Sequence, residues 1–298
     1  MAWRGVHISQ PARLNFRDNQ LIVAQDDGEV SLAIEDVAWL ILDTPQVSVT
    51  GTLLSALAEA GVAMIVPDGR HHPAGVLLSF HQHHAQAHIA QTQINISQPL
   101  KKRLWQNLVV AKIRNQAGLL SQLEGRYAEA LFSMAERVHS GDPDNLEAQA
   151  ARIYWSDLFT DFTRGNETDR RNALLNYGYA VVRAAIARAC VASGLLPAFG
   201  VHHASRTNAF NLIDDLIEPF RPFVDKMARE RVPEGDRDEM TVEDRRFMSG
   251  VLTKTAVIGK EKMTILAATE HVAMAMVRAM EFNSAALLQV PQWAMKAR

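Results

Sequence analysis

GVHHASRTNAFNLIDDLIEPFRPFVD, residues 200–225, is the stretch that best indicates how this chain folds. Thr207 or Asn208 can cap a helix within it, because their side chains accept hydrogen bonds from free backbone N–H groups. Apolar residues then recur at helical spacing and would face a core: Phe210, Ile213, Leu216 and Ile217. Pro219 would clash with the carbonyl four residues earlier, so the helix is expected to kink there. The stretch therefore predicts a kinked helix packed against a core.

Three acids lie on the same predicted helix, and the pair His202-His203 stands just before it. Asp215 and Glu218 are three residues apart, which places their side chains on neighbouring surface; Asp214 is the third acid. Mg²⁺ and Mn²⁺ prefer carboxylate oxygen, Mn²⁺ also accepts imidazole, and phosphodiester chemistry needs such a cation. A metal site is therefore one interpretation. A polar helix face that serves solubility is the other, and either histidine can equally be a core residue.

A further carboxylate, Glu147, lies at the start of another predicted helix. Asn145 is a suitable N-cap, so Glu147 would occupy the first turn, where the helix dipole favours an acid. This structural role accounts for Glu147 without any catalysis. Periodicity does not decide between the two roles.

The character of the sequence changes near Leu78. Before it, short β-rich runs alternate with turn signals, and 12–25 has the apolar alternation and polar centre of a hairpin. After it, the pattern is helical to the end of the chain. We therefore expect an α+β protein with a small, mainly antiparallel β domain at 1–78 and a larger, all-helical domain at 79–298.

Composition describes a folded chain of 298 residues, 48% of them hydrophobic and 21% charged. Cys190 is the single cysteine, so no disulfide can form within the chain, which suits a reducing cytoplasm. The start of the chain lacks the pattern of a signal peptide, and the longest apolar stretch, 52–66, is too short to span a bilayer. The expectation is a soluble, cytoplasmic protein without a membrane partner.

Basic side chains cluster where a long helix is predicted: Lys101, Lys102, Arg103, Lys112 and Arg114 occur with no acid before Leu120. A solvated helix face explains this run as well as a phosphate-binding surface does. The formal net charge of −2 argues mildly against a nucleic-acid partner. The acids, however, predominate over the bases in the first hundred residues, so the helical part can still bind DNA.

Histidines also gather between His71 and His88. His81, His84 and His88 would share one face if 79–90 were helical. No cysteine or carboxylate lies nearby to complete a closed zinc site. A polar linker or a phosphate-contacting face is the preferred interpretation.

Residues 200–225 resemble the signature of the CRISPR-associated protein one family, in the form found beside single-protein type II effectors. That signature is G-x-H-H, N-x-F-N-L and then D-D-L-x-E-P-F-R-P-x-V-D, and every element of it is present. Three other stretches are similar to the family, namely WRGVHISQPARL at 3–14, residues 146–155 and NALLNYGY at 172–179. The resemblance covers nearly the whole chain.

The resemblance implies roles for the acids and histidines. Glu147, His203 and Glu218 match the family's catalytic residues, which coordinate Mg²⁺ or Mn²⁺. Asp215 matches an acid that supports the site, and the alignment selects His203 over His202. The resemblance also implies a β domain that dimerises, a homodimer, and two such dimers that flank a dimer of the small CRISPR-associated protein two.

The implied reaction inserts short captured fragments of foreign DNA into a CRISPR repeat array. The 3′-hydroxyl of the fragment attacks a phosphodiester of the array, so double-stranded DNA of both kinds is an expected partner. The resemblance also implies other type II adaptation proteins as partners, including the effector nuclease. The side chains expected to contact DNA are Lys101, Lys102, Arg103, Arg114, Arg221, Arg245 and Tyr177, the last by stacking on a base unless it is a core residue.

Two other functions compete with an integrase. One is a catalytically silent DNA-binding scaffold subunit of the adaptation complex, in which the acids are only a polar helix face. The other is a metal-dependent phosphohydrolase that acts on small nucleotides. The chain lacks an H-D dipeptide and a G-x-x-x-x-G-K-[ST] loop, which argues against the second.

Overall fold

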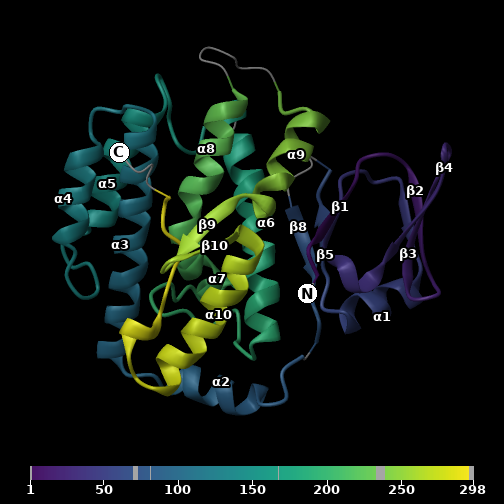
Figure 1. The fold of residues 1–298 in the computed structure, drawn as a ribbon, viewed down its shortest axis with the longest axis horizontal. Helices are drawn as coiled ribbons and strands as arrows, with labels where there is room; N and C mark the ends of the chain where they lie inside the picture. The colour runs from purple at the N-terminus through teal and green to yellow at the C-terminus, as the bar shows by residue number, and fades with distance from the viewer. Residues whose placement is uncertain (1, 70–72, 81, 167, 233–238, 295–298) are drawn as a thin grey trace.

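A computed structural model describes residues 2–69, 73–80, 82–166, 168–232 and 239–294, and it places a strand-rich part beside a helical part (Figure 1). The strands of the first part are β1 (Arg4–Ile8), β2 (Ala12–Arg17), β3 (Gln20–Gln25), β4 (Gly28–Ala33), β5 (Val37–Leu42), β6 (Val47–Val49), β7 (Ala63–Pro67) and β8 (Pro73–Leu77), with helix α1 (Gly51–Glu59) among them. The later helices are α2 (Gln86–Asn95), α3 (Gln98–Gln122), α4 (Ala128–Glu136), α5 (Leu146–Leu158), α6 (Arg170–Ala192), α7 (Asn211–Leu216), α8 (Arg221–Arg231), α9 (Val242–Ser249) and α10 (Ile265–Glu281). The expected α+β class is confirmed, and strands give way to helices between β8 and α2.

The predicted hairpin is formed by β2 and β3, which pair antiparallel with Arg17 opposite Gln20. The two residues between them, Asp18 and Asn19, have φ of 53° and 58°. Asp and Asn tolerate this left-handed conformation better than other residues with a Cβ, and its twist matches that of the flanking strands. The turn chemistry therefore sets the register that buries Leu14.

The pairing of the strands differs from the expected, mainly antiparallel arrangement. The described strands of this part form two sheets, ordered β1-β5-β7-β8 and β4-β3-β2-β6. The pairs β1–β5, β5–β7 and β2–β6 are parallel. Parallel neighbours need a crossover connection. Helix α1 lies within the connection from β5 to β7, and the β2–β4 meander lies within the connection from β1 to β5.

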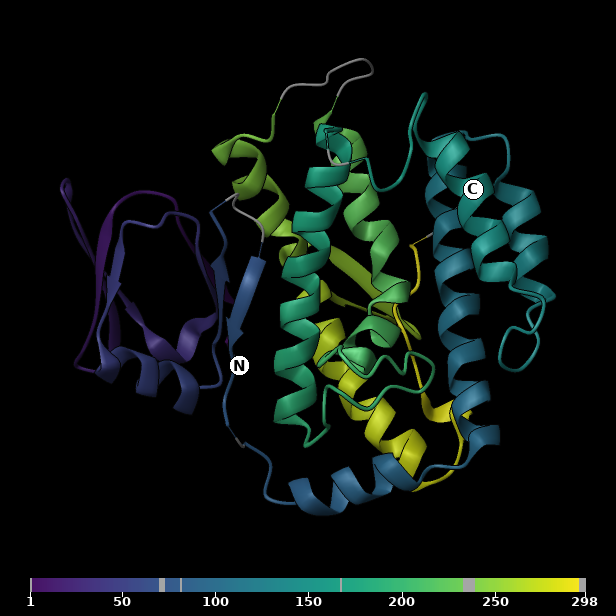
Figure 2. The same cartoon turned by 180° about the vertical axis from the view of Figure 1, so that it is seen from behind.

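Strand β5 is buried on both faces. Ala38 and Ile41 belong to the core of the helical part, whereas Val37 and Leu42 belong to a second core shared with α1 and β2. The β1-β5-β7-β8 sheet therefore lies between the other sheet and helix α6, as both views show (Figure 2). The helical part is thus built directly onto the strand-rich part.

The expected all-helical domain contains a small hairpin, β9 (Thr255–Ile258) and β10 (Glu261–Thr264). The positive φ of Gly259, 61°, allows the tight turn between the two strands. The run Thr255–Ile258 is short and lies between helical patterns, which is why periodicity did not reveal it. Among the described helices none is long and apolar enough to cross a membrane.

The histidine-rich segment does not form the helix considered at 79–90. His71, His72 and His81 lie outside the described residues, and helix α2 begins only at Gln86. His83 and His84 stack on each other with ring centroids 4.7 Å apart. The shared helical face that a zinc site would need is therefore absent from the described part of this segment.

Candidate active site

Glu218 lies in a break between two helices. Helix α7 ends at Leu216, Glu218–Phe220 forms a single 3₁₀ turn, and α8 begins at Arg221, so the kink predicted at Pro219 is confirmed. The side chain of Asn115 on α3 donates a hydrogen bond of 2.8 Å to the carbonyl of Pro219. This bond fixes the break against α3. Glu218 itself is only 4% exposed.

Glu147 lies in the first turn of α5, as predicted from its cap. Asn145 accepts a hydrogen bond from the N–H of Ala148, and Asp142 accepts from the N–H groups of Leu146 and Glu147 at 2.9 and 3.0 Å. Two capping side chains thus satisfy the free donors of this helix end. They fix the backbone of Glu147 at the start of α5.

Lys112 of α3 joins the two glutamates. Its Nζ lies 2.6 Å from Oε1 of Glu147 and 2.5 Å from Oε2 of Glu218. Arg221 contacts the other carboxylate oxygen of Glu218 through Nε at 2.8 Å. The sequence did not predict the contacts of Lys112 with the two glutamates, because Lys112 comes from a helix far from both acids along the chain.

These contacts decide the charges of the site. Burial alone would raise the pKa of Glu218, but Arg221 and Lys112 outweigh it and lower that pKa to about 2. Burial likewise opposes the charged form of Lys112, yet Glu218 and Glu147 raise its pKa above the ordinary value. Glu218 is therefore a carboxylate and Lys112 an ammonium at neutral pH.

Asp215 organises the loop that carries His203. Its fully buried carboxylate accepts the N–H groups of Val201, His202 and His203 at 2.6, 3.1 and 3.0 Å. The same carboxylate lies 2.7 Å from Nδ1 of His203. A Cβ on Gly200 would come within 2.6 Å of it, which explains a glycine there.

The contact with Asp215 defines the chemistry of the His203 ring. An ionised carboxylate only accepts, so in the neutral ring Nδ1 carries the proton and the lone pair of Nε2 is left for a ligand. The hydrogen bond to Asp215 raises the pKa of His203, against the effect of burial. The side chain remains 42% exposed. This arrangement is typical of a metal-binding histidine, whose second nitrogen donates to a carboxylate.

The neighbouring histidine has a different environment. The ring of His202 stacks on Trp105 of α3, with centroids 4.1 Å apart and an angle of 3° between the planes. Trp105 is 2% exposed, so it presents a fixed surface to the imidazole. No carboxylate contact to the ring of His202 is found among the described residues. The geometry therefore favours His203 over His202 as the ligand.

Behind Glu218 lies a small buried group that the sequence did not single out as functional. Asp225 is fully buried and accepts hydrogen bonds from the hydroxyls of Tyr154, at 2.7 Å, and Tyr179. Burial raises the pKa of Asp225 to about 6, although both hydroxyls act in the opposite direction. A cavity of about 180 Å³ lies beside it, with Lys112 and Glu218 also in its lining.

The chemical types of the donor atoms in this site are those that bind a hard divalent cation. Glu147 and Glu218 offer carboxylate oxygen and His203 offers imidazole nitrogen, a set that Mn²⁺ accepts and in which Mg²⁺ finds two of its preferred ligands. In the part of the chain that the structure describes, no three such side chains already converge as a metal cluster. The Lys112 ammonium stands between the two glutamates instead.

The structure divides the residues expected to contact DNA. Lys102, Arg103 and Arg114 are exposed and Lys101 is half-buried, so these four remain predictions. Arg221 lies in the site as the partner of Glu218. Burial contradicts the expectation for Arg245 and gives Tyr177 its alternative role as a core residue.

Arg245 and Tyr177 are buried where the helical part meets the strand-rich part. Arg245 is 5% exposed and its Nε lies 2.7 Å from Oδ1 of Asp43, at the end of β5. Tyr177 is 1% exposed, with its hydroxyl 3.4 Å from Nε2 of His7. Side chains buried in this way cannot reach a DNA backbone or stack on a base. They hold the two parts of the chain together.

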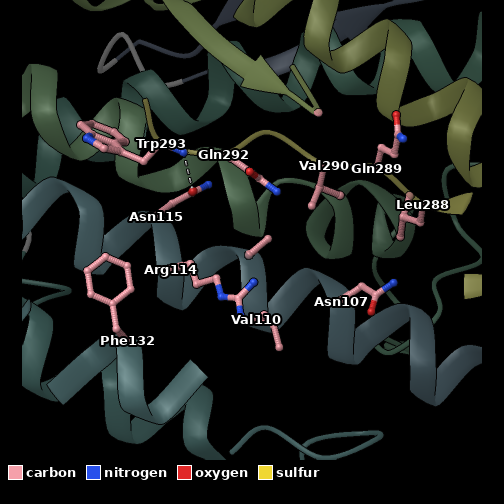
Figure 3. A pocket seen from close by; sticks show the side chains of 12 residues that line it. Asn107, Val110, Arg114, Asn115, Phe132, Leu288, Gln289, Val290, Gln292 and Trp293 are labelled. Atoms are coloured by element: carbon pink, nitrogen blue, oxygen red, sulfur yellow. Dashed lines mark hydrogen bonds between the residues drawn. The ribbon is translucent and has the colours of Figure 1, made fainter. Parts of the chain in front are cut away.

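A larger cavity, of about 410 Å³, lies on another side of α3 (Figure 3). Arg114 lines it, two residues beyond Lys112 and therefore turned about 200° around the helix. Asn107 of the same helix and Gln289 and Gln292 of the final segment add polar groups, and no acid is in the lining. The N–H of Trp293 donates to Asn115 and fixes the final segment there. This cavity is separate from the glutamates and suits a phosphate or a base edge.

Arg114→Ala should weaken binding of duplex DNA about equally for all sequences, because an exposed guanidinium beside neutral polar groups contacts phosphate. The slope of log K against log salt should become less steep by about 1, the loss of one phosphate contact. Fluorescence anisotropy over a salt series measures the slope. Arg126→Ala is the control, since Arg126 is also an exposed arginine but lies beside Asp157. An unchanged slope for Arg114→Ala would remove this residue from the DNA surface.

The fold joins a strand-rich first part to a helical part in which two glutamates meet a lysine and a histidine meets a buried aspartate. Residues 6–257 match the model of the family described as CRISPR associated protein Cas1, and the chain therefore belongs to the Cas1 family. The resemblance noted in residues 200–225 is thereby confirmed.

Individual relatives agree with this assignment. The chain is 37% identical over 295 residues to the CRISPR-associated endonuclease Cas1 of Neisseria meningitidis serogroup C (strain 8013), covering 98% of this chain and 97% of that protein. Its fold is similar to that of a casposase bound to integration product, with a TM-score of 0.77 and 16% identity, covering 95% and 92% of the two chains. It is also similar to a chain of a Cas6-RT-Cas1–Cas2 complex, with a TM-score of 0.74 and 16% identity, covering 99% of this chain and 36% of that longer one. At such identities the two structures show the fold alone.

Proposed function

We propose that this protein is a Mg²⁺- or Mn²⁺-dependent DNA integrase and endonuclease of CRISPR adaptation, which inserts captured DNA fragments into a repeat array. The observation that carries the proposal is the meeting of Glu147 and Glu218 around one cationic group, beside a histidine held by Asp215. Two carboxylates and an oriented imidazole suit a hard cation such as Mn²⁺, and phosphodiester chemistry uses such a cation. Glu147, His203 and Glu218 would hold the metal, and Asp215 would support them.

The names of the relatives support the substrate and the partners. The Neisseria meningitidis relative is called an endonuclease, and the casposase is bound to an integration product. The Cas1-containing chain belongs to a complex with Cas2. We therefore propose duplex DNA and a small Cas2 dimer as partners, and a homodimer formed through the strand-rich part. A type II system, with its effector nuclease as a further partner, is the proposed setting.

The reaction exchanges one phosphodiester for another. The 3′-oxygen of the fragment bonds to phosphorus and loses its proton, the bond from that phosphorus to the 3′-oxygen of the broken strand is cleaved, and that departing oxygen takes up a proton to become a free 3′-hydroxyl. When bound, the divalent cation neutralises charge on the transferring phosphate and polarises the attacking hydroxyl. Asp215 keeps His203 and its loop in place, while Arg221 keeps the Glu218 carboxylate oriented. These contacts fix the ligands before DNA arrives, which is how a preorganised site gains rate.

Purified protein, a Cas2 partner, a short duplex with free 3′-hydroxyls and a repeat-bearing plasmid test the proposal. Integration should occur with Mn²⁺ or Mg²⁺ and should be abolished by EDTA, because without a cation the charge on the transferring phosphate is not neutralised. The readout is fragment-labelled plasmid on a gel.

Integration that persists with EDTA would contradict the metal mechanism. Absence of integration with the partner and metal present would favour the scaffold function instead. Turnover of free nucleotides without activity on DNA would favour a phosphohydrolase.

A further inference from the structure

Lys112 occupies the place that a cation between Glu147 and Glu218 would take. Its ammonium touches one oxygen of each carboxylate, at 2.6 and 2.5 Å, and the residue is 8% exposed. A cation buried this deeply needs partners of opposite charge, and two close carboxylates need a cation between them. The three charges therefore stabilise one another in the protein without metal.

A divalent cation on Glu218 would need Oε2, the oxygen that Lys112 contacts, because Arg221 already contacts Oε1. Mg²⁺ binds carboxylate oxygen at about 2.0–2.1 Å, so the ion would lie next to the ammonium and would repel it at short range. The two positive charges cannot both hold Oε2 of Glu218. We infer that Lys112 is an internal counter-ion that holds Glu147 and Glu218 together in the metal-free protein and must leave them when the metal binds. This inference rests on the proposed function, since it concerns the metal of that same site.

The structure provides a place for the displaced side chain. The cavity of about 180 Å³ beside Glu218 is lined by Lys112 itself, by the polar groups of Gln116 and Asp225, and by the cations Arg164 and Arg221, so the ammonium would turn toward Gln116 and Asp225. Four methylene groups allow a lysine to swing its ammonium while its backbone stays in the helix. Arg221 contacts Oε1 of Glu218, whereas Lys112 contacts Oε2. Arg221 can therefore keep Glu218 in place while Oε2 changes its partner.

Lys112→Met tests the inference by metal binding rather than by activity. Methionine is unbranched and only one atom shorter than lysine, and it removes the competing charge, so the variant should bind Mn²⁺ at least about tenfold more tightly than the wild-type protein, a factor equivalent to 1.4 kcal/mol. Metal-free Lys112→Met should also unfold at a lower temperature, and saturating Mn²⁺ should raise that temperature by more than in wild type. Electron paramagnetic resonance of free Mn²⁺ measures the dissociation constant.

Two matched variants show whether Mn²⁺ affinity depends on the position of the lost positive charge or only on the net charge of the protein. Lys260→Met removes one exposed lysine from the β9–β10 turn and should leave Mn²⁺ affinity unchanged. Lys112→Arg keeps a cation between the glutamates, and its affinity should not exceed that of the wild-type protein. Mn²⁺ affinity of Lys112→Met equal to or below that of the wild type would overturn the inference and leave the proposed site intact. Lack of Mn²⁺ binding by both proteins would remove the proposed site and this inference with it.

A crystal structure of the wild-type protein with Mn²⁺ answers the question even if Lys112→Met does not fold. In that structure the Lys112 ammonium should no longer contact the carboxylates of Glu147 and Glu218. An ammonium that stays within hydrogen-bond distance of Glu147 and Glu218 beside the bound ion would overturn it.

Discussion

Replacing His203 with alanine should reduce DNA integration by at least about 100-fold, the upper end of the losses measured when only an outer partner of a metal ligand is removed. The ring nitrogen that faces away from Asp215 is the one left for a ligand, and alanine has none. The fold should survive, because the backbone N–H of residue 203 still donates to Asp215 and the lost side chain is 42% exposed. Rates at saturating Mn²⁺, with urea unfolding as a check on stability, measure the effect.

His202→Ala is the matched control for this prediction. That change removes a ring stacked on Trp105, a contact worth about 0.5–1.5 kcal/mol, but the N–H of residue 202 still donates to Asp215. Integration should therefore be largely retained. The opposite pattern, with His202→Ala inactive and His203→Ala active, would transfer the ligand role to His202. Equal losses of integration rate in both variants would mean that integration depends on the conformation of the loop and not on one imidazole ring.

Local signals predicted several elements of the fold, two of which carry site residues. The β2–β3 hairpin follows from Asp18 and Asn19, the start of α5 from Asn145, and the break before α8 from Pro219. Each depends on backbone chemistry within a few residues, which a sequence displays directly. For the same reason Glu147 was placed in its helical turn without any knowledge of its neighbours.

Contacts between distant segments were not predictable in this way. Periodicity does show that Trp105 and Lys112 share a face of one helix, since they are seven residues apart. It does not show that this face meets Glu147 and Glu218, because that depends on how α3, α5 and the 3₁₀ turn pack. The same limit explains the error at Arg245. A basic residue in a charged segment is typical of a solvent-exposed face, and its partner Asp43 is 202 positions away.

The Asp43–Arg245 pair should be among the largest contributors to stability. Asp43→Ala should lower the free energy of unfolding by about 3–5 kcal/mol, because it leaves the buried guanidinium without its carboxylate. His7, with Nε2 3.4 Å from Asp43, loses the same partner. Urea unfolding at neutral pH measures the loss. A change below about 1 kcal/mol would mean that water or other groups replace the carboxylate.

A double-mutant cycle separates the pair from its surroundings. Arg245→Met removes the cation and keeps a long apolar side chain, so the double variant Asp43→Ala/Arg245→Met should lose less stability than the sum of the two single losses, with a coupling energy of about 0.5–3 kcal/mol. Arg245→Met alone also tests whether Arg245 contacts DNA. Because Arg245 is buried, folded Arg245→Met should bind DNA with the salt dependence of the wild-type protein, unlike Arg114→Ala. A salt slope that becomes less steep by about 1 in Arg245→Met would show that this guanidinium reaches phosphate after all.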